Sequence, residues 1–193
     1  MVLSLKKLLA RSISQDLEIL IWFSVATVDH HDHDRALKDF KMTGVDILSY
    51  ETLEPKVQYH EYENWSVTTF GLPHNIPNWG AVFKNKITGE KLCYATDCVS
   101  LPLVEQCEHF LIEVNYIEFV IDKIGEKNDW EFESNGFVHH HSLEDTVDYF
   151  TRLKTRPKTI TACHLSYHNA DRKMILKQLQ PFADVVRIAK REE

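Results

Sequence analysis

The sequence is poor in the features that mark several whole classes of protein. Only six of its 193 residues are glycine, which excludes glycine-rich repeats, and no stretch rich in proline, glycine or serine separates two domains. The longest apolar run, residues 19–28, is about half as long as a membrane-spanning helix. We therefore predict a single domain over residues 1–193 that does not cross a membrane.

Basic residues are not in excess, and two common catalytic motifs are absent. The 22 lysines and arginines are outnumbered by 29 acidic residues, and the net charge of −7 argues against broad attraction to nucleic acid. The sequence contains neither G-x-S-x-G nor the glycine loop that cradles phosphates. These absences argue against a serine hydrolase of that type and against a P-loop enzyme.

Cysteine is scarce, and its spacing does not suggest disulfides or a C-x-x-C site. The four cysteines are Cys93, Cys98, Cys107 and Cys163. Free thiols in a reducing cytoplasm are the simplest interpretation. A secretory signal around residues 19–28 is the alternative, but Asp16 and Glu18 fall where its apolar region should begin. We therefore predict a cytoplasmic protein.

Predicted strands and helices alternate along the chain, which indicates an α/β fold. The predicted strands are residues 19–28, 45–48, 65–72, 81–86, 91–96, 110–114, 158–163 and 185–189. The predicted helices are residues 3–11, 35–42, 143–153 and 170–179, and residues 125–138 are predicted to form a loop. Ser142 is placed as the N-cap of the third helix.

Histidine is the one residue type that is both abundant and clustered. There are eleven, and metal-capable side chains follow the ends of four predicted strands: the DHHDHD segment at 29–34, then His74, Asp97 and His164. Strand ends in an α/β sheet face one rim, where such folds place ligands. Imidazole and carboxylate together suit zinc, manganese or iron, so we predict a metal site at that rim.

Each of these residues also has an ordinary structural explanation. The DHHDHD segment can be a solvated surface loop, His74 a turn residue after proline, Asp97 a cap and His164 a satisfied histidine at a strand end. The run at 139–141 can be a polar loop. Their joint occurrence at successive strand ends is what favours the metal site.

Six segments also resemble motifs of one known family in their order and spacing. They read VDHHDHDRALKDF, GLPHN, YATDCV, IEVNY, HHHSLEDTVDYF and CHLSYHNAD. Together they resemble the metallo-β-lactamase fold, in particular its small stand-alone hydrolases from bacteria and phages, over residues 5–190. The resemblance implies a four-layer αββα sandwich whose N-terminal strands are partly missing, because the sequence begins near the first helix.

The signature H-x-H-x-D-H of that family is incomplete in this sequence. The best alignment puts His30, Asp32 and His33 on the second His, the Asp and the last His, and Val28 on the first His. Valine cannot bind a metal, and His31 would compensate only if the strand bulged. Registers that begin the motif at His30 lose more matches.

The resemblance implies one or two zinc ions per chain, with manganese or iron as alternatives. The implied metal ligands are His30, Asp32, His33, His74, Asp97 and His164, with Asp97 bridging the two ions. It also implies two catalytic roles, with Asp32 as the base that orients water and His140 as a proton donor or phosphate ligand. His140 precedes a predicted helix N-terminus, which we expect to favour an anion.

The function predicted first is that of a metal-dependent hydrolase, a phosphodiesterase or nuclease acting on nucleotides or nucleic acid. The excess of acidic over basic residues favours a small nucleotide over a long duplex as substrate. A homodimer in which a partner chain covers the exposed sheet edge is a further expectation. The alternative function is a non-catalytic binding or assembly protein with one metal or none, which the Val28 substitution favours.

Overall fold

The computed structural model describes residues 23–26, 46–49, 51–54, 56–120 and 139–189. The predicted helices at 3–11 and 35–42 and the predicted loop at 125–138 lie outside these residues. No helix among the described residues is both long and apolar enough to span a membrane.

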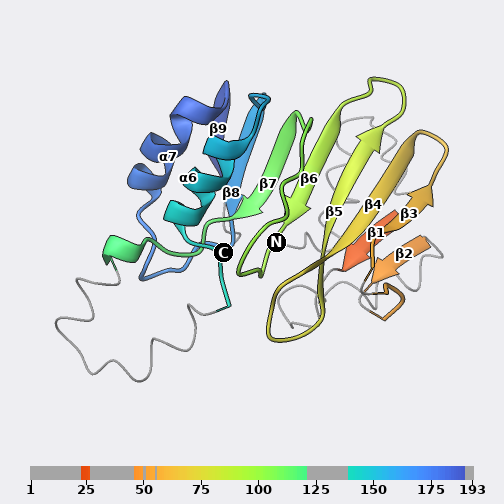
Figure 1. Cartoon of the computed structure of the whole chain (residues 1–193), viewed down its shortest axis with the longest axis horizontal. Coiled ribbons are helices and arrows are strands. Elements are labelled where there is room, and N and C mark those ends of the chain that lie inside the picture. Colours follow the sequence, from red (N-terminus) through yellow and green to blue (C-terminus); the bar gives the residue numbers. More distant parts are fainter. Residues whose placement is uncertain (1–22, 27–45, 50, 55, 121–138, 190–193) are drawn as a thin grey trace, which may run out of the picture.

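A mixed sheet of seven strands forms the centre of the described structure, with the strands side by side in chain order (Figure 1). The strands are β3 (Gln58–Glu61), β4 (Trp65–Leu72), β5 (Asn78–Asn85), β6 (Lys91–Ala95), β7 (His109–Glu113), β8 (Thr159–Cys163) and β9 (Val185–Ile188). Pairing is antiparallel from β3 to β6 and parallel from β6 to β9. The parallel half therefore turns the carboxyl ends of β6, β7 and β8 toward one edge.

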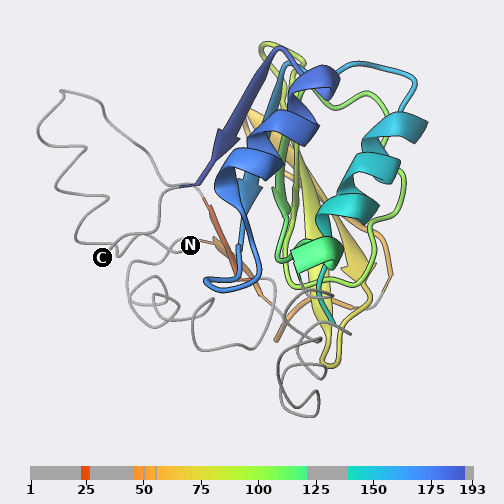
Figure 2. The ribbon, with the colours of Figure 1, turned by 90° about the vertical axis from the view of Figure 1, so that its left-hand side faces the viewer.

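Two helices cover one face of this sheet, α6 (Leu143–Arg152) and α7 (Arg172–Leu179), as Figure 2 shows edge-on. A short 3-10 helix, η1 (Gln180–Phe182), follows α7. The main core lies between the helices and the sheet, where Phe110 of β7 meets Tyr149 and Phe150 of α6 in edge-to-face contacts. This core anchors the parallel strands that carry the candidate site.

The opposite face of the antiparallel half packs against a second, two-stranded sheet. Its parallel strands are β1 (Phe23–Ala26) and β2 (Asp46–Ser49). Leu48 of β2 is buried in a cluster with Val67, Trp79 and Ala81 of β4 and β5. Helices, a seven-stranded sheet and a two-stranded sheet thus form successive layers, and the predicted α/β class is confirmed.

Most predicted strands are present with shifts of one to three residues at their ends. The prediction at residues 65–72 matches β4 at both ends, and the predicted hairpin joins β5 and β6 at Gly89, whose φ of 77° suits glycine. Among the described residues, β3 is the strand that the sequence did not predict, because its sequence QYHE is polar and it lies half exposed at the sheet edge. Periodicity of apolar residues gives no signal for such a strand.

Glycine at position 80 leaves room for the ring of Phe70 on the neighbouring strand. Gly80 pairs with Phe70 across β4 and β5, and a Cβ at this position would lie 2.5 Å from the Phe70 ring and 3.1 Å from the Tyr94 carbonyl oxygen. The Phe70 ring therefore lies over the glycine and fills the space that a side chain would take.

Candidate metal centre

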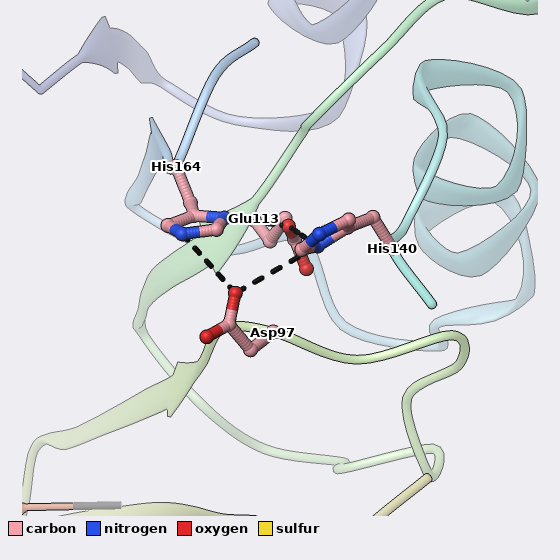
Figure 3. A group of neighbouring side chains, drawn as sticks. All are labelled: Asp97, Glu113, His140 and His164. Carbon is pink, nitrogen blue, oxygen red and sulfur yellow. Dashed lines mark hydrogen bonds and ion pairs between the residues drawn. The ribbon is translucent and has the colours of Figure 1, made fainter. Parts of the chain in front are cut away.

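Three parallel strands end in the polar side chains that form the candidate site. Asp97 lies two residues beyond β6, Glu113 is the last residue of β7, and His164 directly follows β8. Since the three strands are neighbours and parallel, their carboxyl ends bring these side chains to one edge of the sheet (Figure 3). A fourth member, His140, comes from the segment that leads into α6.

The four side chains lie within reach of a single cation. Each of Asp97, Glu113, His140 and His164 offers one ligating atom, and these four atoms all lie within 4.8 Å of one another. His164 Nε2 is 3.1 Å from Asp97 Oδ1, and His140 Nδ1 is 3.7 Å from the same oxygen. Two carboxylates and two imidazoles are a donor set suited to zinc, manganese or iron.

Glu113 connects the two histidines. Its Oε1 accepts hydrogen bonds from His140 Nδ1 at 2.7 Å and from His164 Nδ1 at 2.8 Å, and its Oε2 accepts one from the Cys98 backbone N–H at 2.9 Å. The residue is fully buried. Burial alone raises the pKa of this carboxyl, but the hydrogen bonds from the two histidines outweigh burial and hold the pKa below its ordinary value. Glu113 is therefore ionised at neutral pH.

This hydrogen bonding selects the tautomer of both rings. An ionised carboxylate only accepts hydrogen bonds, so Nδ1 of His140 and Nδ1 of His164 carry the hydrogen. A neutral ring then has its lone pair on Nε2, which in His164 faces Asp97. A carboxylate behind Nδ1 with Nε2 turned to the ion is the usual support of a metal-binding histidine, so the residues present fit a metal.

The three consecutive histidines at 139–141 have different roles. The backbone oxygen of His139 accepts a hydrogen bond from His74 Nδ1 at 3.1 Å, whereas His140 bonds to Glu113. His141 is buried and donates from Nδ1 to the Val99 carbonyl oxygen at 3.1 Å. The segment is therefore tied to two neighbouring loops, which positions His140 over the sheet edge.

The structure brings the predicted residue His74 to the border of the group. Its ring centroid lies 5.8 Å from that of His140, which in turn lies 5.4 Å from that of His164. His74 is not one of the four residues within 4.8 Å. Because His74 Nδ1 donates to a carbonyl, a neutral ring presents the lone pair of Nε2, the form that binds metals.

The remaining predicted residues cannot be compared with the structure. His30, Asp32 and His33, together with His31 and Val28 of the incomplete signature, lie outside the described residues. Their assignment as ligands, and that of Asp32 as a base, stays a prediction.

Glu113 is a site residue that the sequence did not reveal. Its segment, FLIE, was predicted only as an apolar strand. One feature of the sequence could have identified Glu113 as a site residue. It is a charged residue at the carboxyl end of an apolar strand, in a chain where other predicted strands are followed by histidine or aspartate. A buried carboxylate is usually paired with a cation, hydrogen-bonded or bound to a metal.

The cysteines near the site are buried neutral thiols. Cys98 and Cys163 flank Asp97 and His164 in sequence, and all four cysteines of the chain are free and buried. Burial, reinforced by the charges of Glu113 and Asp97, raises the pKa of Cys163 to about 12, and burial likewise raises that of Cys98. Neither belongs to the group of ligating atoms, so these thiols pack against the site as apolar groups.

The sequence matches no protein-family model and no curated protein. Several solved structures are nevertheless similar in backbone. The metallo-β-lactamase fold protein YhfI from Bacillus subtilis superposes with a TM-score of 0.67 at 14% identity, over 96% of this chain and 80% of that chain. The short form of human tRNase Z gives 0.53 at 15% identity, over 94% and 82%.

A third similar structure has different chemistry. CmlA, a diiron β-hydroxylase from Streptomyces venezuelae, gives a TM-score of 0.58 at 8% identity, over 86% of this chain and 43% of that chain. The chain thus has the metallo-β-lactamase fold, as its motifs indicated. At these identities the likeness establishes the fold and leaves the reaction to be argued from the site.

Proposed function

We propose that the chain is a metal-dependent hydrolase that cleaves phosphodiesters of nucleotides or nucleic acid. The observation that carries this proposal is the buried Glu113 carboxylate, which orients two histidines beside Asp97 at the carboxyl edge of the sheet. Zinc is the proposed metal, one or two ions per chain, with manganese or iron as alternatives.

The residues of the cluster divide into ligands and supports. Asp97 and His164 would hold the metal through Oδ1 and Nε2, while Glu113 fixes the His164 ring from the far side. A divalent ion bound there polarises a phosphoryl oxygen and lowers the pKa of water towards 7. The additional ligands His30, Asp32, His33 and His74, and Asp32 as the water-orienting base, complete the proposed site.

His140 is the proposed proton donor. Its Nδ1 is engaged by Glu113, so Nε2 is the ring nitrogen that exchanges a proton with a substrate. The protonated ring is the form that can give a proton to a leaving alkoxide. The same Glu113 oxygen thus orients a metal-holding ring and a proton-donating ring.

The phosphodiester class is supported by the acid and metal chemistry of the site and by the likeness to a structure named tRNase Z. The net charge of −7 favours a small nucleotide over long nucleic acid. Acidic side chains at the start of α6 oppose the anion that we expect this helix N-terminus to favour. Its first turn carries Glu144 and Asp145, and Ser142 already accepts the Asp145 N–H.

Metal analysis of protein purified without chelator, combined with a panel of phosphodiesters, tests the proposal. We expect one or two equivalents of metal per chain and activity that a chelator abolishes. Protein that binds no metal and hydrolyses no member of the panel would favour the alternative, a non-catalytic binding or assembly protein.

Replacement of the proposed proton donor gives a sharper test. We expect His140→Ala to lower the rate roughly 10²- to 10⁴-fold while metal content stays constant. The loss should shrink for substrates with good leaving groups, such as nitrophenyl esters, because these need no proton. His109→Ala removes an imidazole from the opposite end of β7 and should leave the rate unchanged. An equal loss for all leaving groups would assign His140 to binding.

A further inference from the structure

Two residues of the cluster share an unusual backbone conformation. Asp97 and His164 have φ values of 52° and 53°, in the left-handed region that L-residues seldom adopt. Among the described residues, Gln106 is the one further non-glycine residue with positive φ, and it is not part of the cluster. Strained conformations of this kind persist where the surroundings hold them in place.

A buried asparagine holds the first of the two residues. Asn78, at the start of β5, donates from Nδ2 to the Thr96 carbonyl oxygen at 2.8 Å and to the Asp97 carbonyl oxygen at 2.5 Å. The residue is only 3% exposed, and its Oδ1 has no hydrogen-bond partner among the described residues. The amide is therefore oriented by its two donor bonds, both made to the backbone at Asp97.

A second asparagine holds the other residue in the same way. Asn115, two residues after the end of β7, donates from Nδ2 to the His164 carbonyl oxygen at 2.9 Å. Its own backbone is fixed, because its N–H donates to the His141 carbonyl oxygen at 2.9 Å and its carbonyl oxygen accepts from Ser166 N–H at 2.8 Å. Asn115 thus ties the His164 backbone to the two segments beside it.

We propose that Asn78 and Asn115 are positioning residues of the metal centre. Each holds the carbonyl oxygen of a left-handed residue, which fixes the adjoining peptide plane and so the direction of the Cα–Cβ bond. Together they set Asp97 Oδ1 and His164 Nε2 at 3.1 Å before a metal arrives. This inference rests on the proposed function to the extent that the centre binds a divalent metal.

Cobalt binding by full-length variants tests the inference without an activity assay. Co²⁺ titrations followed by calorimetry and by visible absorption report the affinity and the coordination geometry. We expect Asn78→Ala and Asn115→Ala each to weaken Co²⁺ binding about 10- to 100-fold and to change the absorption spectrum. Both substitutions are neutral, so they leave the charge of the site unchanged.

A matched variant in the same strand separates positioning from general stability. Asn85, at the other end of β5, accepts hydrogen bonds on Oδ1 from the N–H groups of Ile87 and Thr88. Asn85→Ala therefore also removes two side-chain hydrogen bonds, and we expect its Co²⁺ affinity and spectrum to equal those of the wild type. Wild-type affinity and spectrum in both site variants would overturn the inference.

The outcomes remain distinct if a variant is unstable or if the wild type binds no metal. Asn115→Ala keeps both backbone hydrogen bonds of residue 115, so we expect this variant to fold. If Asn78→Ala does not fold, the Co²⁺ affinity and spectrum of Asn115→Ala test the positioning role. Absence of Co²⁺ binding by the wild type would refute the proposed function itself. Binding by the wild type and equally by the variants would refute only the role of the asparagines.

Discussion

Glu113 is the residue on which the chemistry of the candidate site depends most. A fully buried carboxylate is costly unless its oxygens are hydrogen-bonded, and here both are, to two imidazoles and a backbone N–H. The charge therefore does two things at once. It fixes the tautomer of His140 and that of His164, and it holds both rings in one orientation.

Glu113→Gln keeps the shape of this side chain and removes its charge. We expect the variant to bind divalent metal about 10- to 100-fold more weakly, because a glutamine oxygen is a poorer acceptor for two Nδ1–H groups. Calorimetric titration with Zn²⁺ measures the change. Glu90→Gln, which removes a carboxylate from an exposed ion pair with Lys158, is the control and should bind as the wild type does.

Glu113→Gln should also change how the free energy of unfolding depends on pH. The pKa of Glu113 in the folded chain is below its ordinary value of 4.5, so its carboxylate stabilises the fold above that pH. This contribution is lost as the pH falls through the lower, folded value. As the pH falls below about 4.5, the free energy of unfolding of the metal-free wild type should therefore fall more than that of Glu113→Gln. Parallel curves from denaturant unfolding would contradict this assignment.

At the level of elements, the start of α6 decides how firmly His140 is held. Ser142, which is buried, accepts the Asp145 N–H on its hydroxyl at 2.9 Å and donates from the same hydroxyl to Glu118 at 3.3 Å. His140 precedes this cap by two residues. The cap therefore connects the rigid helix to the segment that carries the proposed proton donor.

Ser142→Ala should show this connection. We expect a loss of about 1 kcal/mol in the free energy of unfolding and a several-fold lower rate of the proposed hydrolysis, because the segment before the helix loosens. Asp171→Ala removes the equivalent cap of α7, where Asp171 accepts from Lys173 and Met174 N–H groups. It should cost similar stability with little effect on the rate. Ser142→Thr keeps a cap hydroxyl and should retain most of the activity. Equal rates for Ser142→Ala and Asp171→Ala would show that the cap of α6 has no specific role in the reaction.

At the level of the whole molecule, the site exists only when the sheet is assembled. Its four side chains come from the ends of three parallel strands and from the segment before α6, and 67 positions separate the first from the last. An unfolded chain cannot hold these atoms within a few ångströms of one another. Metal binding is therefore expected to stabilise the entire fold.

Thermal unfolding with and without Zn²⁺ measures this coupling. At a free metal concentration 100 times the dissociation constant, we expect stabilisation by about 2.7 kcal/mol, which raises Tm by several degrees. His164→Ala should abolish most of the shift, since it removes an Nε2 that faces Asp97. His60→Ala, in the edge strand β3, should keep the shift. A Tm that Zn²⁺ leaves unchanged in the wild type would exclude a metal site that forms with the fold.

Sequence patterns alone predicted the alternation of strands and helices, the N-cap at Ser142 and the positions of Asp97 and His164 just beyond apolar strands. These features depend on residues close together in the chain, so periodicity and capping patterns reveal them. Which side chains meet depends instead on contacts between segments that lie far apart in the chain. Glu113 lies 27 positions from His140 and 51 from His164, and its pairing with them follows from strand order and from the path of the segment before α6. The same holds for the asparagines that hold Asp97 and His164, because a left-handed backbone at a non-glycine residue depends on hydrogen bonds from distant parts of the chain.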